Sequence, residues 1–310
     1  MKIVFMGTPE FAAAHLKEIV ESGNNVAGVF SQPDRPKGRG QRVEPTPVKA
    51  VATNYGIPVF QPEKINSDEG FERLAELSPD IIVVVAFGKL LKSGVINLPP
   101  IGCFNVHASL LPKYRGAAPI QRAIENGETK TGITIFKIDE GMDTGEIALK
   151  RELEIHPSDT FGSLYLKLAE LGKKTLVHFL EEVKEGRLEL TPQDGIPSYA
   201  PKIQPSDLVI SDLSDAAKVI NKIRAYDPQP GARISVEGRM SKVFGASLLC
   251  RNEKEGRVGE IVKIDDRGMI VSCGAENVII SLVQFPGKKP MRPKDALSGR
   301  LIGEGIILGG

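Results

Sequence analysis

The chain has 310 residues, of which 41% are apolar and 25% charged, and its formal net charge is +1. These values indicate a soluble globular protein with room for two domains, and they exclude overall charge as evidence for a nucleic-acid partner. No apolar run reaches the length that spans a bilayer, and the start MKIVFMGTPEF lacks the basic and apolar regions of a secretion signal. We therefore expect a cytoplasmic protein with no membrane segment.

The three cysteines, Cys103, Cys250 and Cys273, are scattered and form no CxxC pair, and only four histidines are present. This usage favours buried, reduced thiols over a disulfide framework or a metal site. We expect no bound metal.

The N-terminal half alternates apolar runs with helical patterns. Residues 8–23 predict a helix with Thr8 as its cap, Pro9 in the first turn and Gly23 beyond the end. Strands are expected at 2–6, 25–31, 57–60, 80–87, 102–108 and 131–138, and further helices at 117–127 and at 158–186, where Ser158 and Asp159 are the cap signals. Such alternation predicts right-handed crossovers onto a doubly wound, mainly parallel sheet.

The text changes at about 187–206, which is rich in Pro, Ser and Asp and reads as a linker. One helix is expected beyond it, at 215–226. Strand-like runs then follow at 232–238, 241–250, 259–264, 268–273 and 277–285. Short strands at this spacing predict a small β-barrel or a compact antiparallel sheet. We therefore divide the chain into domains at 1–188 and 207–310, joined by a linker at 189–206.

The turn after the first strand, MGTPEFA, has a single glycine and does not match GxGxxG, and no GxxxxGK[ST] occurs in the chain. These motifs cradle dinucleotides and ATP phosphates. The doubly wound sheet is therefore not expected to bind NAD or to hydrolyse ATP.

Asn105 and His107 interrupt an apolar run in CFNVHASLLP, just before a turn marked by Pro and Gly. The strand period of two puts both side chains on one face, at the carboxyl end of a strand, where open α/β sheets hold their active sites. A hydrogen-bonded structural pair in the core is an equally open interpretation of these two residues.

A second polar cluster, DEGMDTGE, crowds Asp139, Glu140, Asp143 and Glu146 into eight residues after another strand. It could be a solvated acidic loop, and its spacing fits a calcium loop poorly. The alternative is that one of these carboxylates meets the Asn105 and His107 side chains. A carboxylate beside an imidazole fixes its tautomer and raises its basicity, as acid–base chemistry requires.

The stretch NVHASLLPKYRGAAPIQRAIENGETKTGITIFKIDEGMDTGEI (105–147) resembles the signature of the folate-dependent formyltransferases, as do IVFMGTPEFA and SQPDRPKGRGQ near the start. The resemblance continues more weakly through YAPKI (199–203) and RAYDPQPG (224–231). It implies an α/β fold with an N-terminal doubly wound, Rossmann-like, mainly parallel sheet and a smaller C-terminal β-barrel of OB-like type.

The resemblance also implies an activity and its residues. A formyl group would pass from 10-formyltetrahydrofolate to the α-amino group of methionine on initiator tRNA, with Asn105, His107 and Asp143 as the catalytic residues. Which of His107 and Asp143 takes the proton stays open. The turn Ser109, Leu110, Leu111 and Pro112 would contact the folate, with residues 81–91 as a candidate for the opposite wall. We expect a monomer.

The basic residues define where a tRNA would bind. The segment 32–49 carries Arg35, Lys37, Arg39 and Arg42, and its glycines and prolines are expected to exclude a regular element, so it reads either as a solvated loop or as a mobile tRNA-binding loop. A second strip contains Lys288, Lys289 and Arg292. Two alternatives stay open: a formyltransferase acting on a small amine or a nucleotide-linked amino sugar, and a folate- or RNA-binding module without catalysis.

Overall fold

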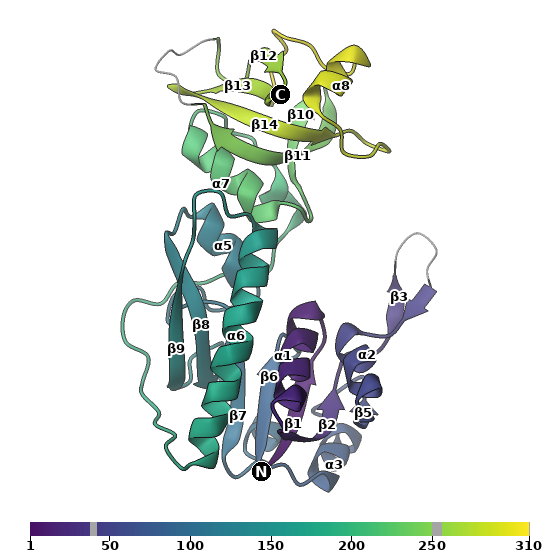
Figure 1. The fold of residues 1–310 in the computed structure, drawn as a ribbon, viewed down its shortest axis with the longest axis vertical. Helices are drawn as coiled ribbons and strands as arrows, with labels where there is room; N and C mark the ends of the chain where they lie inside the picture. Colours follow the sequence, from purple (N-terminus) through teal and green to yellow (C-terminus); the bar gives the residue numbers. More distant parts are fainter. Residues whose placement is uncertain (38–41, 250–255, 310) are drawn as a thin grey trace. The chain divides into compact units, whose positions relative to one another are not determined.

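The computed structural model describes residues 1–37, 42–249 and 256–309 (Figure 1). Arg39 and Cys250 lie outside the described residues. The chain forms two compact units, each assembled from three segments. The first unit contains Met1–Gly116, Thr131–Leu153 and Tyr165–Tyr199, and the second contains Ala117–Lys130, Glu154–Leu164 and Ala200–Gly310.

The first unit is built on a seven-stranded sheet with the order β5-β2-β1-β6-β7-β8-β9. Its strands are β1 (Lys2–Gly7), β2 (Asn25–Phe30), β5 (Val59–Phe60), β6 (Ile81–Val85), β7 (Gly102–His107), β8 (Lys130–Lys137) and β9 (Ile147–Glu154). Neighbouring strands from β5 to β7 are parallel, whereas β8 runs antiparallel to β7. The predicted mainly parallel sheet is confirmed.

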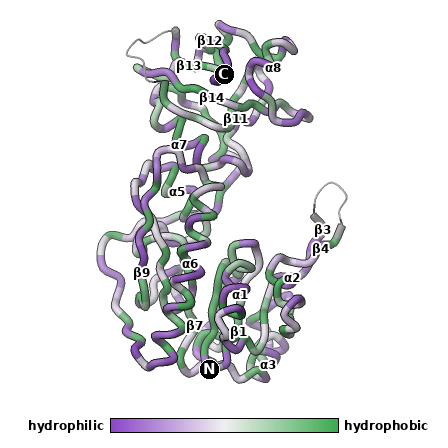
Figure 2. Tube along the Cα trace, in the orientation of Figure 1, coloured by the Kyte–Doolittle hydropathy of each residue, from purple (hydrophilic) through white to green (hydrophobic). Residues whose placement is uncertain are grey.

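Helices cover both faces of this sheet because the side chains of each strand alternate between two apolar layers. Val4 and Met6 of β1 pack in a buried cluster with Leu74 of α3 (Asp68–Glu76) and Val95 of α4 (Ser93–Ile96). On the opposite face of β7, the ring of Phe104 lies 4.8 Å from that of Phe179 in α6 (Phe161–Lys184). Strand β1, whose apolar side chains contribute to both layers, is labelled in Figure 2. The sheet is therefore doubly wound, as predicted.

One predicted helix cap is wrong. Helix α1 (Glu10–Glu21) has Pro9 at its N-cap, and Thr8 instead donates its hydroxyl hydrogen bond to the carbonyl oxygen of Phe87, at 3.3 Å. At the start of α6, Thr160 accepts a hydrogen bond from the Ser163 N–H at 3.3 Å, and Asp159 accepts one from the Ser163 hydroxyl at 2.7 Å. Gly23 follows α1 in a left-handed conformation, as expected.

The expectation that residues 32–49 contain no regular element is also wrong. Strands β3 (Arg35–Lys37) and β4 (Arg42–Glu44) form an antiparallel hairpin, and α2 (Pro47–Asn54) begins directly after it. Pro36 pairs in register with Val43. A two-stranded ribbon has an unpaired edge on both sides, so a proline without an N–H is tolerated there. In Figure 1 the hairpin projects from the sheet of the first unit.

The segment after α6, predicted to be a linker, is attached to the first unit. Thr191 pairs with Ile147 at the start of β9, and Tyr199 pairs with Arg115. The Ser198 hydroxyl accepts a hydrogen bond from the Tyr114 N–H at 2.9 Å. Residues 191–199 therefore lie along the loops that follow β7 and β8.

The second unit contains a five-stranded antiparallel sheet with the order β10-β11-β14-β13-β12. The C-terminal residues close it, because Leu308 bridges to Val236 at the end of β10 and Ile307 bridges to Glu260 just before β12. The sheet thus forms the small barrel predicted for this part of the chain. Its strands are β10 (Ala232–Val236), β11 (Arg239–Leu248), β12 (Ile261–Asp265), β13 (Gly268–Cys273) and β14 (Glu276–Gln284).

Short helices complete the second unit. They are α5 (Pro119–Glu125), η1 (Pro205–Leu208), α7 (Ala216–Tyr226) and α8 (Pro293–Ser298). Arg122 of α5 forms ion pairs with Glu125 at 2.7 Å and with Asp207 of η1 at 2.6 Å. The buried Tyr226 of α7 donates its hydroxyl hydrogen bond to the same Glu125 at 3.2 Å. No helix in the described ranges has the combined length and apolarity that crossing a lipid bilayer requires.

Candidate active site

Strand β7 positions two of the expected catalytic residues at its carboxyl end. Asn105 pairs with Phe136 and His107 with Thr134 of the neighbouring β8, so both lie on one face of the sheet. Cys103, earlier on the same face, is fully buried in the apolar cluster beneath them. Burial raises the pKa of its thiol to about 12. Cys103 is therefore a protonated core residue and not a nucleophile.

The His107 imidazole is buried, with 6% of its surface exposed. Its Nε2 lies 2.9 Å from the carbonyl oxygen of Tyr114. A carbonyl oxygen can only accept, so this bond places a proton on Nε2. The other ring nitrogen, Nδ1, then faces the Asp143 carboxylate, with 3.7 Å to Oδ2. The two groups are within ion-pair distance but beyond hydrogen-bond distance, so the carboxylate faces the imidazole as a neighbouring charge.

Asp143 comes from the loop between β8 and β9, and it is the member of the acidic cluster that meets His107. Its Oδ2 accepts a hydrogen bond from the Gly116 N–H at 2.7 Å. Its side chain is 18% exposed, and no described residue bonds to Oδ1, which is open to a substrate. Asp143 also has a φ of +52°, a left-handed conformation that costs a non-glycine residue on the order of 1 kcal/mol.

The other three carboxylates of this cluster have local roles. Asp139 accepts hydrogen bonds from the Gly141 N–H at 3.0 Å and from the Thr144 hydroxyl at 2.7 Å, which shapes the turn. Glu140 pairs with Ser93, and Glu146 is exposed. No cluster of metal-ligating side chains is found in the part of the chain that the structure describes.

The half-buried Asn105 lacks the hydrogen-bond partners expected of an asparagine with a structural role in the core. Its amide forms no hydrogen bond with another residue of the described ranges, although it lies two residues from His107 on the same face. An asparagine that stabilises the core would pair its amide with neighbouring polar groups. The observation weighs against the structural interpretation of the Asn105 and His107 pair.

The turn of Ser109, Leu110, Leu111 and Pro112 is fixed by its own protein contacts. Thr134 donates its hydroxyl hydrogen bond to the Ser109 carbonyl oxygen at 2.7 Å and accepts one from the Leu111 N–H at 3.1 Å. Lys150 donates to the Leu111 carbonyl oxygen at 2.6 Å. The Leu111 side chain is fully buried against Phe136. Leu111 therefore anchors the turn and does not itself cover a ligand, whereas Leu110 is only partly buried.

The sheet edge continues from β7 to the ends of β6, β1 and β2. After β6, Ala86 has a left-handed φ of +46° and Phe87 presents its carbonyl oxygen to Thr8 and to the Gln32 side chain, the latter at 3.1 Å. Strand order reverses between β1 and β6, and such reversals open a crevice at the carboxyl ends of the strands. Thr8, predicted only as a helix cap, and Gln32, for which no role was predicted, thus lie at the same edge of the sheet as Asn105.

The base of the β3–β4 hairpin is held by a polar network. The Lys49 ammonium donates to Asp34 at 2.5 Å and to Gln61 at 2.8 Å, and Gln61 donates to Asp34 at 2.7 Å. Burial alone would raise the pKa of Asp34, but the hydrogen bonds from Gln61 and Lys49 outweigh it and lower that pKa. The network fixes where the hairpin leaves the unit, and Arg35 at its start is exposed.

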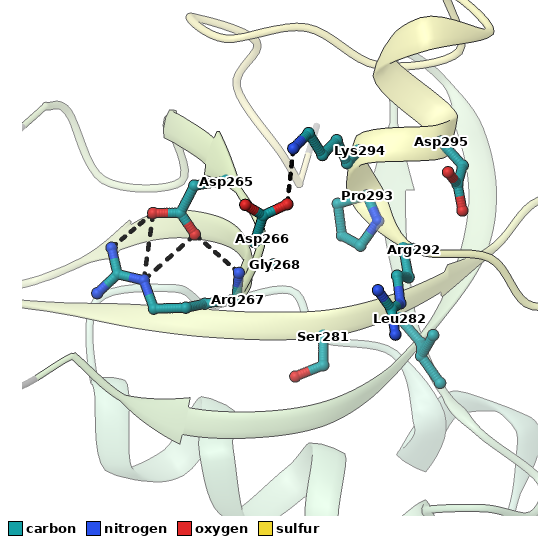
Figure 3. Close-up of a pocket in the computed structure, with 10 residues that line it drawn as sticks. All are labelled: Asp265, Asp266, Arg267, Gly268, Ser281, Leu282, Arg292, Pro293, Lys294 and Asp295. Carbon is teal, nitrogen blue, oxygen red and sulfur yellow. Dashed lines mark hydrogen bonds and ion pairs between the residues drawn. The ribbon is translucent and has the colours of Figure 1, made fainter.

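In the second unit, Lys288, Lys289 and Arg292 are all exposed. Arg292 lines a hollow of about 310 Å³ in which Arg267 is paired with Asp265 at 2.6 Å and Lys294 with Asp266 at 2.6 Å (Figure 3). The hydrogen bonds from Arg267 lower the pKa of Asp265 to about 2. Arg292 forms no ion pair with a described residue. Its charge is therefore less compensated than those of the other two cations.

A doubly wound sheet that brings an amide, an imidazole and a carboxylate to its carboxyl edge has the groups that a group-transfer reaction requires. The chain belongs to the formyl transferase family: residues 1–180 match the family model described as formyl transferase, and residues 202–301 match its C-terminal domain. Two of the family's segments are thus present in the expected order along this chain.

Known relatives agree with this assignment. The chain is 58% identical to the methionyl-tRNA formyltransferase of Kosmotoga olearia over 100% of both chains. The structure of HypX from Aquifex aeolicus in complex with tetrahydrofolic acid superposes with a TM-score of 0.69 at 20% identity, covering 98% of this chain and 48% of HypX. An N-formyltransferase from Helicobacter canadensis, in complex with folinic acid and dTDP-3-aminofucose, gives 0.68 at 21% identity and 92% and 99% coverage. The last two show a shared fold.

Proposed function

We propose that this chain transfers the formyl group of 10-formyltetrahydrofolate to the α-amino group of the methionine carried by initiator tRNA. The observation that supports the chemistry is the contact of His107 Nδ1 with Asp143 Oδ2 at 3.7 Å, two positions along β7 from Asn105, whose amide has no partner among the described residues. The identity of the acceptor rests on the 58% identity to a methionyl-tRNA formyltransferase over the full chain. No metal takes part in this proposal.

The reaction needs a proton acceptor and an oxyanion donor. The amine nitrogen attacks the formyl carbon, the carbonyl electron pair moves to oxygen, and the amine loses a proton. The resulting tetrahedral adduct collapses when the bond from the formyl carbon to N10 of the folate breaks and N10 takes up a proton. Asn105 donates an amide N–H to the oxyanion, which is where a fixed dipole lowers the barrier most.

Geometry assigns different positions to the other two residues. His107 is buried with Nε2 held by Tyr114, whereas Asp143 Oδ1 has no partner among the described residues. We therefore propose that Asp143 accepts the amine proton and that His107, through Nδ1, stabilises the protonated His107–Asp143 pair. The same proton is then returned to the departing N10.

The folate would bind at the carboxyl edge of the sheet. The turn of Ser109, Leu110, Leu111 and Pro112 would bound it on one side, with the ends of β6 and β1 on the other. Because Thr134 and Lys150 already bond the turn, it is a rigid surface for the ligand. Leu110 is the side chain of the turn that can cover an apolar ring.

The tRNA would be held by basic residues of both units. The segment 35–42 contributes Arg35, Lys37, Arg39 and Arg42, and the strip after β14 contributes Lys288, Lys289 and Arg292. In this proposal residues 1–188 form the catalytic domain and 207–310 the tRNA-binding barrel, and the connecting residues 189–206 are attached to the first unit through Thr191 and Tyr199. The protein acts as a monomer in the cytoplasm, without a membrane partner.

A panel of acceptors tests the proposal against its alternatives. Formyl transfer from labelled 10-formyltetrahydrofolate is measured to methionyl initiator tRNA, methionyl elongator tRNA, free methionine and a nucleotide-linked amino sugar. We expect the highest kcat/KM with the initiator tRNA. A higher value with the amino sugar would establish the small-molecule alternative, and folate binding without transfer to any acceptor would indicate a binding module.

A further inference from the structure

Gln193 lies in the segment that the sequence presents as a linker, yet it connects the two loops of the candidate active site. Its side-chain Nε2 donates to the backbone carbonyl oxygens of Asp143 at 2.8 Å and Gly145 at 2.9 Å. Its Oε1 accepts from Arg115, at 2.6 Å from Nη2 and 3.2 Å from Nε. Both donors and both acceptor positions of this amide are therefore in use.

Gln193 bonds two loops that determine the His107–Asp143 contact: the loop after β7, which bonds the imidazole, and the loop after β8, which contains Asp143. Arg115 lies between Tyr114, whose carbonyl oxygen accepts from His107 Nε2, and Gly116, whose N–H donates to Asp143 Oδ2. Gln193 thus contacts the loop that orients the imidazole through Arg115, and it contacts the backbone of Asp143 itself.

Both loops also contain a residue in an unfavourable backbone conformation next to these contacts. Tyr114 has a φ of +62° and Asp143 a φ of +52°. Left-handed non-glycine residues persist only where surrounding contacts determine the conformation. Ser198 bonds the Tyr114 N–H, and Gln193 bonds the Asp143 carbonyl oxygen. The segment 191–199 therefore supplies the contacts that keep both residues in place.

We propose that Gln193 is a positioning residue for formyl transfer, acting by setting the location of the Asp143 carboxylate relative to His107 and Asn105. The inference rests on the proposed function, since it assumes that Asp143 takes part in the reaction. Gln193 has no hydrogen-bonding capacity left for a substrate, so it acts through Asp143 and not by contact with the reacting atoms. A displacement of about 1 Å at a catalytic group lowers rates by roughly 10²-fold.

Single-turnover formyl transfer, with enzyme in excess over methionyl initiator tRNA, tests this role. Gln193→Ala is expected to lower the transfer rate about 10- to 100-fold while changing KM for the folate and the tRNA less than about threefold. Gln193→Glu keeps an acceptor for Arg115 but loses both donors to the Asp143 loop, so a similar loss is expected. Ile196→Ala, at a side chain that is 89% exposed in the same segment, is the control and should match the wild type.

A double-mutant cycle separates positioning from general support of the fold. In an Asp143→Ala background there is no carboxylate to position, so adding Gln193→Ala should lower the rate less than about twofold further. An undiminished loss in that background, or wild-type rates in Gln193→Glu, would overturn the proposal. If Asp143→Ala alone transfers formyl at the wild-type rate, the catalytic assignment of Asp143 fails and the role of Gln193 fails with it, whereas a loss in Asp143→Ala together with wild-type rates in Gln193→Glu overturns the role of Gln193 alone.

Discussion

Replacing Asn105 with alanine should abolish most of the activity and leave the fold intact. The amide is half-buried and has no hydrogen-bond partner in the described ranges, so its removal strands no donor or acceptor. We expect the free energy of unfolding to change by less than about 1 kcal/mol. An oxyanion donor lost from the transition state should lower kcat by about 10²- to 10³-fold, or about 2.7–4 kcal/mol.

Steady-state kinetics with methionyl initiator tRNA and 10-formyltetrahydrofolate, combined with thermal unfolding, measure both effects. KM values should change little, because the bond to the oxyanion forms only in the transition state. Asn24→Ala is the matched control: this asparagine is also half-buried with an unpaired Oδ1, but it precedes β2 at the opposite edge of the sheet. Wild-type kcat in Asn105→Ala, or a loss of activity that follows a loss of folded protein, would refute the reasoning.

Three further predictions concern stability, the tRNA and metals. His15 is buried, and desolvation lowers its pKa from 6.5 to about 4, so the unfolded chain binds a proton before the folded chain does as the pH falls. The free energy of unfolding, measured with urea, should therefore drop by up to about 3 kcal/mol as the pH falls from 6.5 to 4. The pH dependence should be weaker in His15→Leu. In a binding titration, Lys288→Ala should reduce the slope of log affinity for tRNA against log salt concentration by about 0.9. Arg42→Ala should instead reduce the discrimination between initiator and elongator tRNA by about 1–3 kcal/mol. Unchanged values in both variants would remove these residues from the interface. Formyl transfer should continue after the enzyme is treated with a chelator, provided that the magnesium which the tRNA needs is added back. Activity that returned only with a different divalent ion would contradict the proposed chemistry.

The sequence predicted the parts of the fold that depend on periodicity. The buried run of β6 and the alternating pattern of β7 are decided by apolar burial, which the sequence records directly. Four of the eight residues of strand β9 are charged and exposed, so the strand lacks an apolar run, which is why it was not predicted. The β3–β4 hairpin was missed because its stability comes from pairing and from the network at Asp34, and not from local propensity.

The candidate site shows the same division. The same-face placement of Asn105 and His107 follows from the strand period, and the closeness of Asp143 follows from the pairing of β7 with β8. Gln193 could not be found this way, because its partners Asp143 and Arg115 are distant in sequence and are reached by an irregular segment. The burial of Leu111, which lies within an apparently exposed turn, likewise depends on packing against Phe136.

The most direct test of the account follows a labelled formyl group from 10-formyltetrahydrofolate in the presence of methionyl initiator tRNA and either the wild-type protein or Asp143→Ala. The account predicts that the label appears on the α-amino group of the methionine with the wild type, and that Asp143→Ala, although folded and still able to bind the folate, transfers it at least about 10²-fold more slowly. Transfer at equal rates by the two proteins, or no label on the amino group with the wild type, would contradict it.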